Sequence, residues 1–253
     1  GTRLKPMTDL LPKCLMPIRG RPLMEYWLAD LRRAGVKEIM INLHHGANQV
    51  RDFLLQYTDS GLNTELVYES ELKGTGGTLR YNHDFFFGHT VLLVHADNFC
   101  RCDFEAFINH HRHRPAGTAM TMMTFTADDP RQCGVVEVDA LGVVQGLHEK
   151  VADPPGRLAN AAVYLIENEV LEYLSNLDNE FVDFSTDVLP AFVGRISTWF
   201  NTGVHRDIGT PASLVAAQKE CFTPLSHSSS AWAHDFARHP IHQKLSDLKG
   251  EKL

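Results

Sequence analysis

The sequence contains no run of apolar residues long enough to cross a lipid bilayer, and no signal-peptide pattern opens it. We therefore expect a cytoplasmic protein without a membrane partner. Positive charge is also scarce, because 24 Lys and Arg residues stand against 31 Asp and Glu residues and give a formal net charge of −7. This balance argues against a broad nucleic-acid-binding surface, so a phosphate site must concentrate its cations locally.

The sequence also lacks the cysteine spacings that are typical of disulfide frameworks or metal sites. The five cysteines are an odd number and show no zinc-ligand spacing, so we expect free thiols. Histidine, in contrast, is frequent, and three of the 14 histidines cluster at His110, His111 and His113. We interpret that cluster as the polar end of a helix closed by Pro115 rather than as a metal site.

The first hundred residues alternate between helix and strand patterns at short intervals. The apolar spacing predicts a helix over residues 22–35 and strands over residues 37–43, 64–69 and 90–96, with the strand at 37–43 buried. Such alternation predicts an α/β fold with a mostly parallel sheet flanked by helices. Ligands of these folds gather beyond the carboxyl ends of the strands.

The pattern changes after residue 125. Residues 134–150 predict a β-hairpin, and residues 160–166 return as a strand. A helix is expected over residues 184–192. Thr210, followed by proline, then marks the start of a further helix.

The end of the chain is polar. We therefore divide the sequence into a domain of residues 1–223 and a polar tail of residues 224–253 with short helices. The sequence leaves the oligomeric state open, and the tail could supply a contact in a homo-oligomer.

The first 13 residues place Arg3 and Lys13 on one irregular loop, because Pro6 and Pro12 prevent a helix. Two cations on a stiff, non-helical backbone suit a polyphosphate. An ordinary basic N-terminal arm explains the same residues, so features elsewhere in the chain must decide between the two interpretations.

Two further features point to the same chemistry. The glycines of Gly74-Thr-Gly-Gly77 let a planar or phosphorylated ligand approach the backbone, although a tight strand-to-helix turn explains them equally well. Asp97 closes an apolar strand and Asp207 precedes a helix, and Mg²⁺ carrying a triphosphate is one partner that suits such carboxylates. Each acid taken alone is explained more simply as a cap or turn residue.

Taken together, these motifs resemble the sugar-1-phosphate nucleotidylyltransferase family, and most closely its mannose-1-phosphate guanylyltransferase-like members. One such motif means little, but the ordered set is specific. The matching segments are Gly1-Thr-Arg-Leu-x-Pro-x-Thr8, Pro12-Lys13, Glu71-Leu-Lys-Gly-Thr-Gly-Gly77, Ala96-Asp97-Asn98, Gly134, Glu149-Lys150, Asn160 and Asp207-Ile-Gly-Thr-Pro211. The resemblance implies a Rossmann-like core with a small inserted β-rich sugar-binding lobe.

The resemblance also implies roles for individual residues. The catalytic cations, which would hold the triphosphate and neutralise its α-phosphate, are Arg3 and Lys13. The residues implied to bind the nucleotide are Gly1, Thr2, Glu71, Gly76, Gly77 and Asp97. Those implied to line the sugar-phosphate pocket are Gly134, Glu149, Lys150 and Asn160. The implied ligands of Mg²⁺ are Asp97 and Asp207.

The implied reaction is in-line attack by the phosphate of a sugar 1-phosphate on the α-phosphorus of a nucleoside triphosphate, with release of pyrophosphate. A phosphate nucleophile needs no side-chain activation, which agrees with the lack of a Ser-His-Asp or Cys-His arrangement. The Glu-x-x-Gly-Thr-Gly-Gly pattern resembles guanylyltransferases that use mannose or heptose 1-phosphate, so we expect GTP as the donor. Three alternatives stay open: a uridylyltransferase, a cytidylyltransferase acting on another sugar phosphate or phosphocholine, and a non-catalytic regulator that binds a nucleotide sugar.

The sequence departs from the family pattern in several places. The family usually has a buried strand and a glycine-rich turn before Gly-Thr-Arg, so we expect both to precede Gly1 in the full protein. Val151 stands where proline is common, and His205-Arg206 stand where an aromatic residue is common before the metal-binding acid. Hexapeptide repeats of a β-helix are missing after residue 218, so a bifunctional acyltransferase is not expected.

Overall fold

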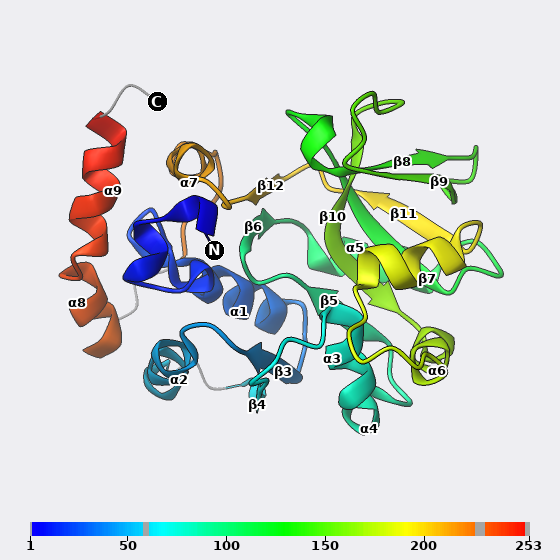
Figure 1. Cartoon of the computed structure of the whole chain (residues 1–253), viewed down its shortest axis with the longest axis horizontal. Helices are drawn as coiled ribbons and strands as arrows, with labels where there is room; N and C mark the ends of the chain where they lie inside the picture. Colours follow the sequence, from blue (N-terminus) through cyan, green and yellow to red (C-terminus); the bar gives the residue numbers. More distant parts are fainter. Residues whose placement is uncertain (1, 58–60, 226–230, 251–253) are drawn as a thin grey trace. The chain divides into compact units, whose positions relative to one another are not determined.

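The computed structural model describes residues 2–57, 61–225 and 231–250, and its helices and strands are labelled in Figure 1. The chain divides into two compact units. The first unit comprises Gly1–Ser70, Ala96–Cys102 and Gly203–Leu253, and the second comprises Glu71–His95 and Asp103–Thr202. None of the helices within the described ranges is long and apolar enough to cross a membrane.

The first unit combines short ladders with helices. Its strands pair as β1 with β2 and β6 with β12, both antiparallel, and as β3 with β4 in parallel. The elements are η1 (Thr2–Leu4), η2 (Met7–Asp9), η3 (Lys13–Leu15), β1 (Pro17–Ile18), β2 (Arg21–Pro22), α1 (Leu23–Arg33), β3 (Glu38–Leu43), α2 (Ala47–Gln56), β4 (Asn63–Tyr68), β6 (Asn98–Arg101), β12 (Val204–Asp207), α7 (Pro211–Ala217), α8 (Ala231–Ala237) and α9 (Ile241–Gly250).

The N-terminal loop is ordered by its apolar side chains. Three 3₁₀ turns, η1 to η3, follow one another, and Leu4, Met7 and Leu15 on them are at most 1% exposed. Burial of these three side chains anchors a backbone that the prolines keep out of an α-helix. The predicted irregular loop is therefore confirmed.

Helix α1 confirms the predicted first helix and helps to position β6. Its apolar residues recur at helical spacing, and most of them are buried. The indole nitrogen of Trp27 donates a hydrogen bond to the carbonyl oxygen of Asn98 at 2.9 Å. This bond ties the helix to the residue that follows Asp97.

The prediction of a buried strand at residues 37–43 is wrong in one respect. The strand forms as β3, but only Leu43 is buried, and Ile39, Met40 and Ile41 are half-buried. Among the described strands β3 pairs with β4 alone, so its other edge lacks a neighbouring strand within those residues. Apolar alternation predicts a strand but does not reveal how many neighbours cover it.

The second unit is built on a six-stranded sheet in the order β11-β7-β10-β8-β9, with β5 also paired to β10. Helices flank this sheet, which confirms the α/β class (Figure 1). Its elements are α3 (Thr75–Tyr81), α4 (His83–Phe86), β5 (Val91–Val94), α5 (Phe104–Arg112), β7 (Met120–Thr126), η4 (Pro130–Gln132), β8 (Gly134–Val138), β9 (Val144–Glu149), β10 (Leu158–Ile166), α6 (Asn168–Ser175), η5 (Phe184–Val188), η6 (Leu189–Phe192) and β11 (Ile196–Phe200).

Strand pairing is more mixed than the predicted parallel sheet. β11 runs parallel to β7, as β3 does to β4, whereas β10 is antiparallel to β5, β7 and β8. The reason is the β8–β9 hairpin, which confirms the prediction for residues 134–150 and sends the chain back through the sheet as β10. β10 thereby connects the inserted hairpin to the central strands.

The segment predicted as a helix over residues 184–192 is helical but irregular. A π-helical turn, η5, leads directly into the 3₁₀ turn η6. Pro190 has no amide hydrogen, so it cannot continue a regular hydrogen-bond series. Asp183 caps the segment by accepting hydrogen bonds from the amides of Ser185 and Thr186.

The histidine cluster lies at the end of α5, as predicted, but it is not simply a polar end. His111 is buried, and its ring contacts the Thr121 hydroxyl at 2.7 Å and the Glu167 carboxylate at 2.9 Å. His110 contacts the Ser197 hydroxyl at 3.1 Å. These contacts fix α5 against β7 and β11.

Candidate active site

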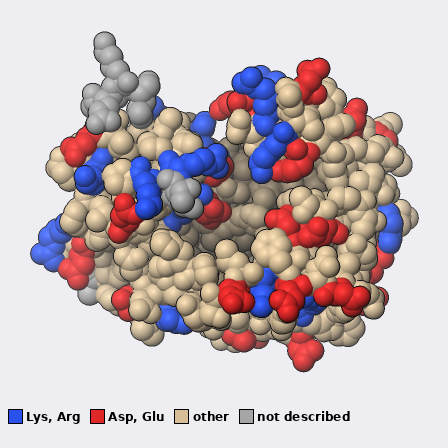
Figure 2. Space-filling model, in the orientation of Figure 1, with Lys and Arg blue, Asp and Glu red and all other residues tan. Residues whose placement is uncertain are grey.

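The two cations of the N-terminal loop each face one of the two predicted acids. The Lys13 ammonium lies 3.3 Å from the Asp97 carboxylate, and the Arg3 guanidinium lies 3.9 Å from the Asp207 carboxylate. The side chain of Lys13 is 20% exposed and that of Arg3 is 65% exposed, so the Lys13–Asp97 pair is the better shielded. Basic and acidic side chains lie side by side over this part of the first unit (Figure 2). The structure thus brings together the four charged residues for which the sequence predicts triphosphate and metal roles.

The β6–β12 ladder brings the two acids to one end of the same pair of strands. Asp207, the last residue of β12, is the register partner of Asn98, and Asp97 immediately precedes Asn98. Lys13 follows Pro12, whose extended backbone starts η3. Four side chains from three distant segments therefore meet at one place in the first unit.

Gly209 belongs to this site, although the sequence patterns predicted no role for it. A Cβ atom at residue 209 would lie 2.9 Å and 3.0 Å from the two carboxylate oxygens of Asp207 and 3.3 Å from the Arg3 guanidinium. The position must therefore lack a side chain if Asp207 and Arg3 are to stay where they are. The signal was present in the sequence as Asp207-Ile-Gly-Thr-Pro211.

The helix after Gly209 begins as predicted. Thr210 accepts a hydrogen bond from the Ser213 amide, the Ser213 hydroxyl completes a capping box, and Pro211 occupies the first turn of α7. This rigid start fixes the chain three residues after Asp207.

The donor set at this place fits a magnesium ion that is shared with a ligand. Mg²⁺ is usually held by one or two carboxylates together with substrate phosphates, rather than by a cage of protein groups. Asp97 and Asp207 supply two carboxylates, and the described residues contain no group of three His, Cys, Asp or Glu side chains that could hold a metal by themselves. The two acids therefore suit a metal that brings phosphate oxygens with it.

Cys14 follows Lys13 in the N-terminal loop. Burial, with a smaller contribution from the Asp97 carboxylate, raises the pKa of its thiol to about 12. This shift disfavours the reactive thiolate near neutral pH.

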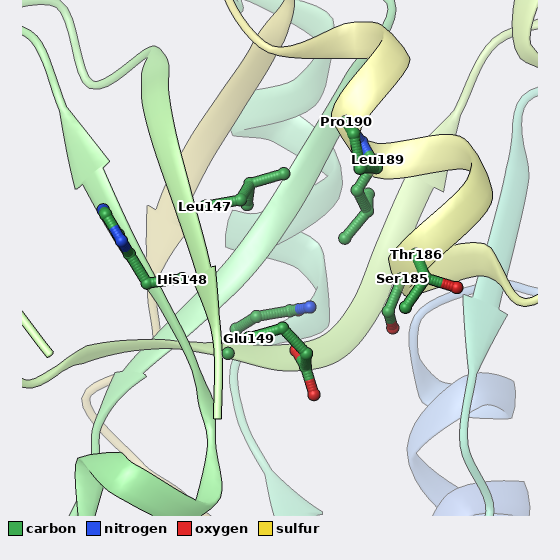
Figure 3. A pocket seen from close by; sticks show the side chains of 9 residues that line it. Leu147, His148, Glu149, Ser185, Thr186, Leu189 and Pro190 are labelled. Carbon is green, nitrogen blue, oxygen red and sulfur yellow. The ribbon is translucent and has the colours of Figure 1, made fainter. Parts of the chain in front are cut away.

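The second unit contains a cavity of about 220 Å³ between the β8–β9 hairpin, β10 and the turns η5 and η6 (Figure 3). Its lining residues are Gly134, Leu147, His148, Glu149, Asn160, Ser185, Thr186, Leu189 and Pro190. Three of the four residues predicted for the sugar-phosphate pocket are among them. The fourth, Lys150, does not line the cavity, but its ammonium lies 2.8 Å from the Glu149 carboxylate.

Gly134 and Glu149 are register partners across the hairpin. A Cβ atom at residue 134 would lie 2.6 Å from a carboxylate oxygen of Glu149, so the glycine makes room for that carboxylate. Leu147 and Glu149 share one face of β9, whereas His148 points away from them (Figure 3). His148 instead contacts the Glu137 carboxylate at 2.7 Å.

The far wall of the cavity was not predicted from the sequence. Ser185 and Thr186 come from η5 and Leu189 from η6, and Figure 3 shows them opposite Leu147 and Glu149. The cap at Asp183 is the one local signal that could have pointed to this turn.

The glycines of residues 74–77 are explained by packing within the second unit. A Cβ atom at Gly74 would lie 2.3 Å from the carbonyl oxygen of Val182, and one at Gly76 would lie 2.7 Å from the Val182 side chain. The amides of Gly76 and Gly77 both donate to that carbonyl, at 2.9 Å and 3.1 Å. These amides are therefore engaged by the protein itself.

The remaining predicted nucleotide-binding residues are Glu71, Thr2 and Gly1. Glu71 is exposed in the second unit, and Thr2 lies in the η1 turn of the first. Gly1 lies outside the described residues.

Comparisons with known proteins agree with the motifs. The model of the family described as nucleotidyl transferase matches residues 1–223. A mannose-1-phosphate guanylyltransferase of Mycobacterium tuberculosis is 26% identical over 241 residues, which cover 92% of this chain and 65% of the relative. A UTP–glucose-1-phosphate uridylyltransferase of Synechocystis is 26% identical over 206 residues, covering 76% of this chain and 53% of the relative.

A similar fold occurs in the crystal structure of HddC from Yersinia pseudotuberculosis. The two chains superpose with a TM-score of 0.71 at 24% identity, and the match covers 87% of this chain and 94% of the other. The chain thus spans 65% of one of these curated relatives and 53% of the other, and nearly all of this solved structure. Since the family match takes in 223 of the 253 residues, the protein belongs to the nucleotidyl transferase family.

Proposed function

We propose that the chain catalyses transfer of a nucleoside monophosphate from a nucleoside triphosphate to a sugar 1-phosphate in the presence of Mg²⁺, releasing pyrophosphate. The observation that carries this proposal is the pairing of Lys13 with Asp97 and of Arg3 with Asp207 at one end of the β6–β12 ladder. Membership of the nucleotidyl transferase family supports the same chemistry.

The charged cluster of the first unit suits the triphosphate. Lys13 and Arg3 would contact phosphate oxygens and neutralise the charge that builds up on the α-phosphate in the transition state. Asp97 and Asp207 would hold Mg²⁺, which when bound supplies further neutralisation of the phosphates. An incoming phosphate is already an anion, so no side chain has to remove a proton from it.

The cavity of the second unit suits the sugar 1-phosphate. Glu149, Asn160 and Ser185 offer carboxylate, amide and hydroxyl groups to sugar hydroxyls, and Leu147 and Leu189 offer apolar contacts to the ring. Lys150 would contribute its positive charge beside Glu149.

The proposed donor is GTP and the proposed acceptor is mannose or heptose 1-phosphate. The Glu71-to-Gly77 motif and the guanylyltransferase among the relatives support this choice. Because the Gly76 and Gly77 amides are engaged by Val182 and a Cβ atom at either residue would meet protein atoms, these glycines would contribute to base binding by keeping this turn closely packed. The uridylyltransferase among the relatives makes UTP with glucose 1-phosphate the second candidate pair.

A substrate screen tests the proposal. ATP, GTP, CTP and UTP are each combined with mannose, heptose, glucose and N-acetylglucosamine 1-phosphates and with phosphocholine, and Mg²⁺-dependent pyrophosphate release is measured. The highest turnover is expected for GTP with mannose or heptose 1-phosphate. A preference for UTP would overturn the donor assignment alone. Binding of a nucleotide sugar without turnover of any pair would overturn the enzymatic proposal.

A further inference from the structure

A single buried hydroxyl lies behind two residues that line the cavity of the second unit. Tyr164, on β10, is 1% exposed and does not line the cavity itself. Its hydroxyl accepts a hydrogen bond from the Asn160 side-chain amide at 2.7 Å, and the Ser185 side chain lies near it. Asn160 and Ser185 come from different elements, β10 and η5.

The Asn160 amide is held at both of its ends. Its oxygen accepts a hydrogen bond from the Ala162 backbone amide at 2.9 Å, and its nitrogen donates to Tyr164. The pairing of β10 with β7 is irregular between Asn160 and Tyr164, and Ala162 has a φ of 53°. The side chain thus supports a bulge whose shape in turn fixes the direction of the amide.

Within the described part of the chain, one hydrogen of this amide has no acceptor and remains for a ligand. A side-chain amide nitrogen carries two hydrogens, and Tyr164 takes only one of them. Because the oxygen is committed to Ala162, a flipped amide would place two donors against each other and is excluded. The remaining hydrogen therefore has a defined direction before a ligand arrives.

The Tyr164 ring is fixed from the side of η5 as well. Its centroid lies 4.9 Å from that of Phe184, the residue directly before Ser185. Burial outweighs the hydrogen bond from Asn160 and raises the pKa of the Tyr164 hydroxyl above its usual value. The hydroxyl therefore stays neutral and can both donate and accept a hydrogen bond.

We propose that Tyr164 is a positioning residue for sugar-phosphate recognition, which acts through the Asn160 amide without touching the ligand. This inference rests on the proposed function, because it takes the cavity as the site of the sugar 1-phosphate. A role in packing alone would be served equally well by phenylalanine, which has the same ring and avoids burying a hydroxyl.

The test is Tyr164→Phe, with Tyr173→Phe as its matched control. Tyr173 belongs to the same unit, and its hydroxyl donates to the Asp187 carbonyl at 3.2 Å, but it does not line the cavity. The probe is mannose 1-phosphate, or the sugar 1-phosphate preferred in the substrate screen. We expect Tyr164→Phe to raise its KM by about tenfold, the effect of one lost hydrogen bond, while the KM of the nucleotide and the KM values of Tyr173→Phe stay unchanged.

Two further measurements separate positioning from stability. In protein labelled with ¹⁵N-asparagine, the side-chain amide signals of Asn160, assigned with Asn160→Ala, should shift in Tyr164→Phe and stay in place in Tyr173→Phe. The double variant Asn160→Ala/Tyr164→Phe should bind the sugar 1-phosphate no more weakly than Asn160→Ala, because Tyr164 acts mainly through that side chain.

The experiments distinguish a failure of the Tyr164 proposal from a failure of the proposed function. An unchanged sugar KM in Tyr164→Phe, with only a lower melting temperature, would overturn the positioning role and leave the proposed function intact. Wild-type protein that binds no sugar 1-phosphate would overturn the proposed function, and this inference with it.

Discussion

At the scale of single residues, the contrast between two ion pairs of the N-terminal loop defines a sharp test. Asp97 pairs with Lys13, and Asp9, also in the first unit, pairs with Lys5 at 3.4 Å on the surface. We expect Asp97→Asn to lower Mg²⁺-dependent kcat by about 100-fold or more, because a charged group aimed at the phosphates is lost. Its melting temperature should change little, since the carboxylate is 43% exposed.

Asp9→Asn is the control for this substitution. It also removes one carboxylate facing a lysine, and kcat should be nearly unchanged. Near-normal turnover in Asp97→Asn would refute the role of that acid. A comparable loss in Asp9→Asn would mean that the loop is sensitive to any change of charge.

The lack of space for a side chain at Gly209 leads to a second prediction. In Gly209→Ala the new methyl group would displace the Asp207 carboxylate and the Arg3 guanidinium, which are the ends of flexible side chains. We expect kcat/KM to fall by about tenfold or more, with the melting temperature nearly unchanged. Gly156→Ala is the control, because a Cβ atom there has no neighbour within 4 Å. Steady-state kinetics that are equal in the two variants would contradict the prediction.

Replacing Ala162 by glycine is expected to stabilise the protein. Its positive φ costs an alanine about 1 kcal/mol relative to glycine, so Ala162→Gly should raise the free energy of unfolding in urea by roughly that amount. The neighbouring Ala161→Gly should instead lower it, because Ala161 is fully buried. A loss of stability in both variants would show that the strain at Ala162 is negligible.

The sequence predicted charged residues better than it predicted their surroundings. Arg3, Lys13, Asp97 and Asp207 were identified because each belongs to an ordered set of motifs and carries a charge that packing alone does not require. Tyr164 was not identified, since in a β-strand pattern it resembles any other aromatic residue of the core. Its hydrogen bonds depend on a bulge that periodicity does not encode.

At the scale of elements, the C-terminal helix α9 braces the N-terminal loop, while α8 packs elsewhere in the first unit. α9 packs against η2 and α7, and α8 packs against α2. Ile241 and Leu245 on α9 are at most 4% exposed, and the Trp232 ring on α8 lies 4.6 Å from that of Phe53 on α2. The 3₁₀ turn η2 lies between Arg3 and Lys13, so α9 supports the backbone that carries both cations.

Leu245→Ala tests this bracing. The truncation should cost about 2 kcal/mol or more of stability and should also raise the KM for the nucleoside triphosphate several-fold. Ile196→Ala is the matched control, because Ile196 is fully buried in the core of the second unit. It should show a similar loss of stability without the change in nucleotide KM. An unchanged KM in Leu245→Ala would limit α9 to a stabilising role.

Elements were predictable where local signals were strong. The hairpin at residues 134–150 and the cap at Thr210 followed from turn and capping chemistry and appear as predicted. The tail of residues 224–253 was identified by its polarity, but the docking of α9 rests on two apolar residues four positions apart, too few to stand out in its composition. The exposure of β3 likewise depends on its neighbours, which the pattern within the strand does not reveal.

At the scale of the whole molecule, each unit carries a separate part of the proposed chemistry. The first unit assembles its charged cluster from three stretches of chain, and the second holds the cavity. Local sequence could indicate both sets of residues. It could not indicate that the cations and acids share one compact unit while the cavity residues share the other.

The stability of the whole molecule should depend on pH through buried and half-buried histidines in both units. Burial lowers the pKa of His110 and His111 in the second unit and of His239 in the first. For His111, the Arg114 cation lowers the pKa further, and the hydrogen bond to Glu167 only partly opposes this. The unfolded chain therefore binds more protons than the folded one once the pH falls below the ordinary histidine pKa of about 6.5.

The sign of this linkage gives the final prediction. Stability is fully present above pH 6.5 and should fall as the pH decreases through the lowered pKa values, by up to about 1.4 kcal/mol per pH unit for each histidine involved. Urea unfolding at pH 7.5, 6.5 and 5.5 measures the slope. His111→Gln should reduce it, whereas His113→Gln, whose exposed ring contacts only the Asn109 carbonyl oxygen among the described hydrogen bonds, should leave it unchanged. A slope that is the same in wild type and His111→Gln would show that the His111–Glu167 pair stays protonated in the folded protein, with burial too weak to disfavour the charge.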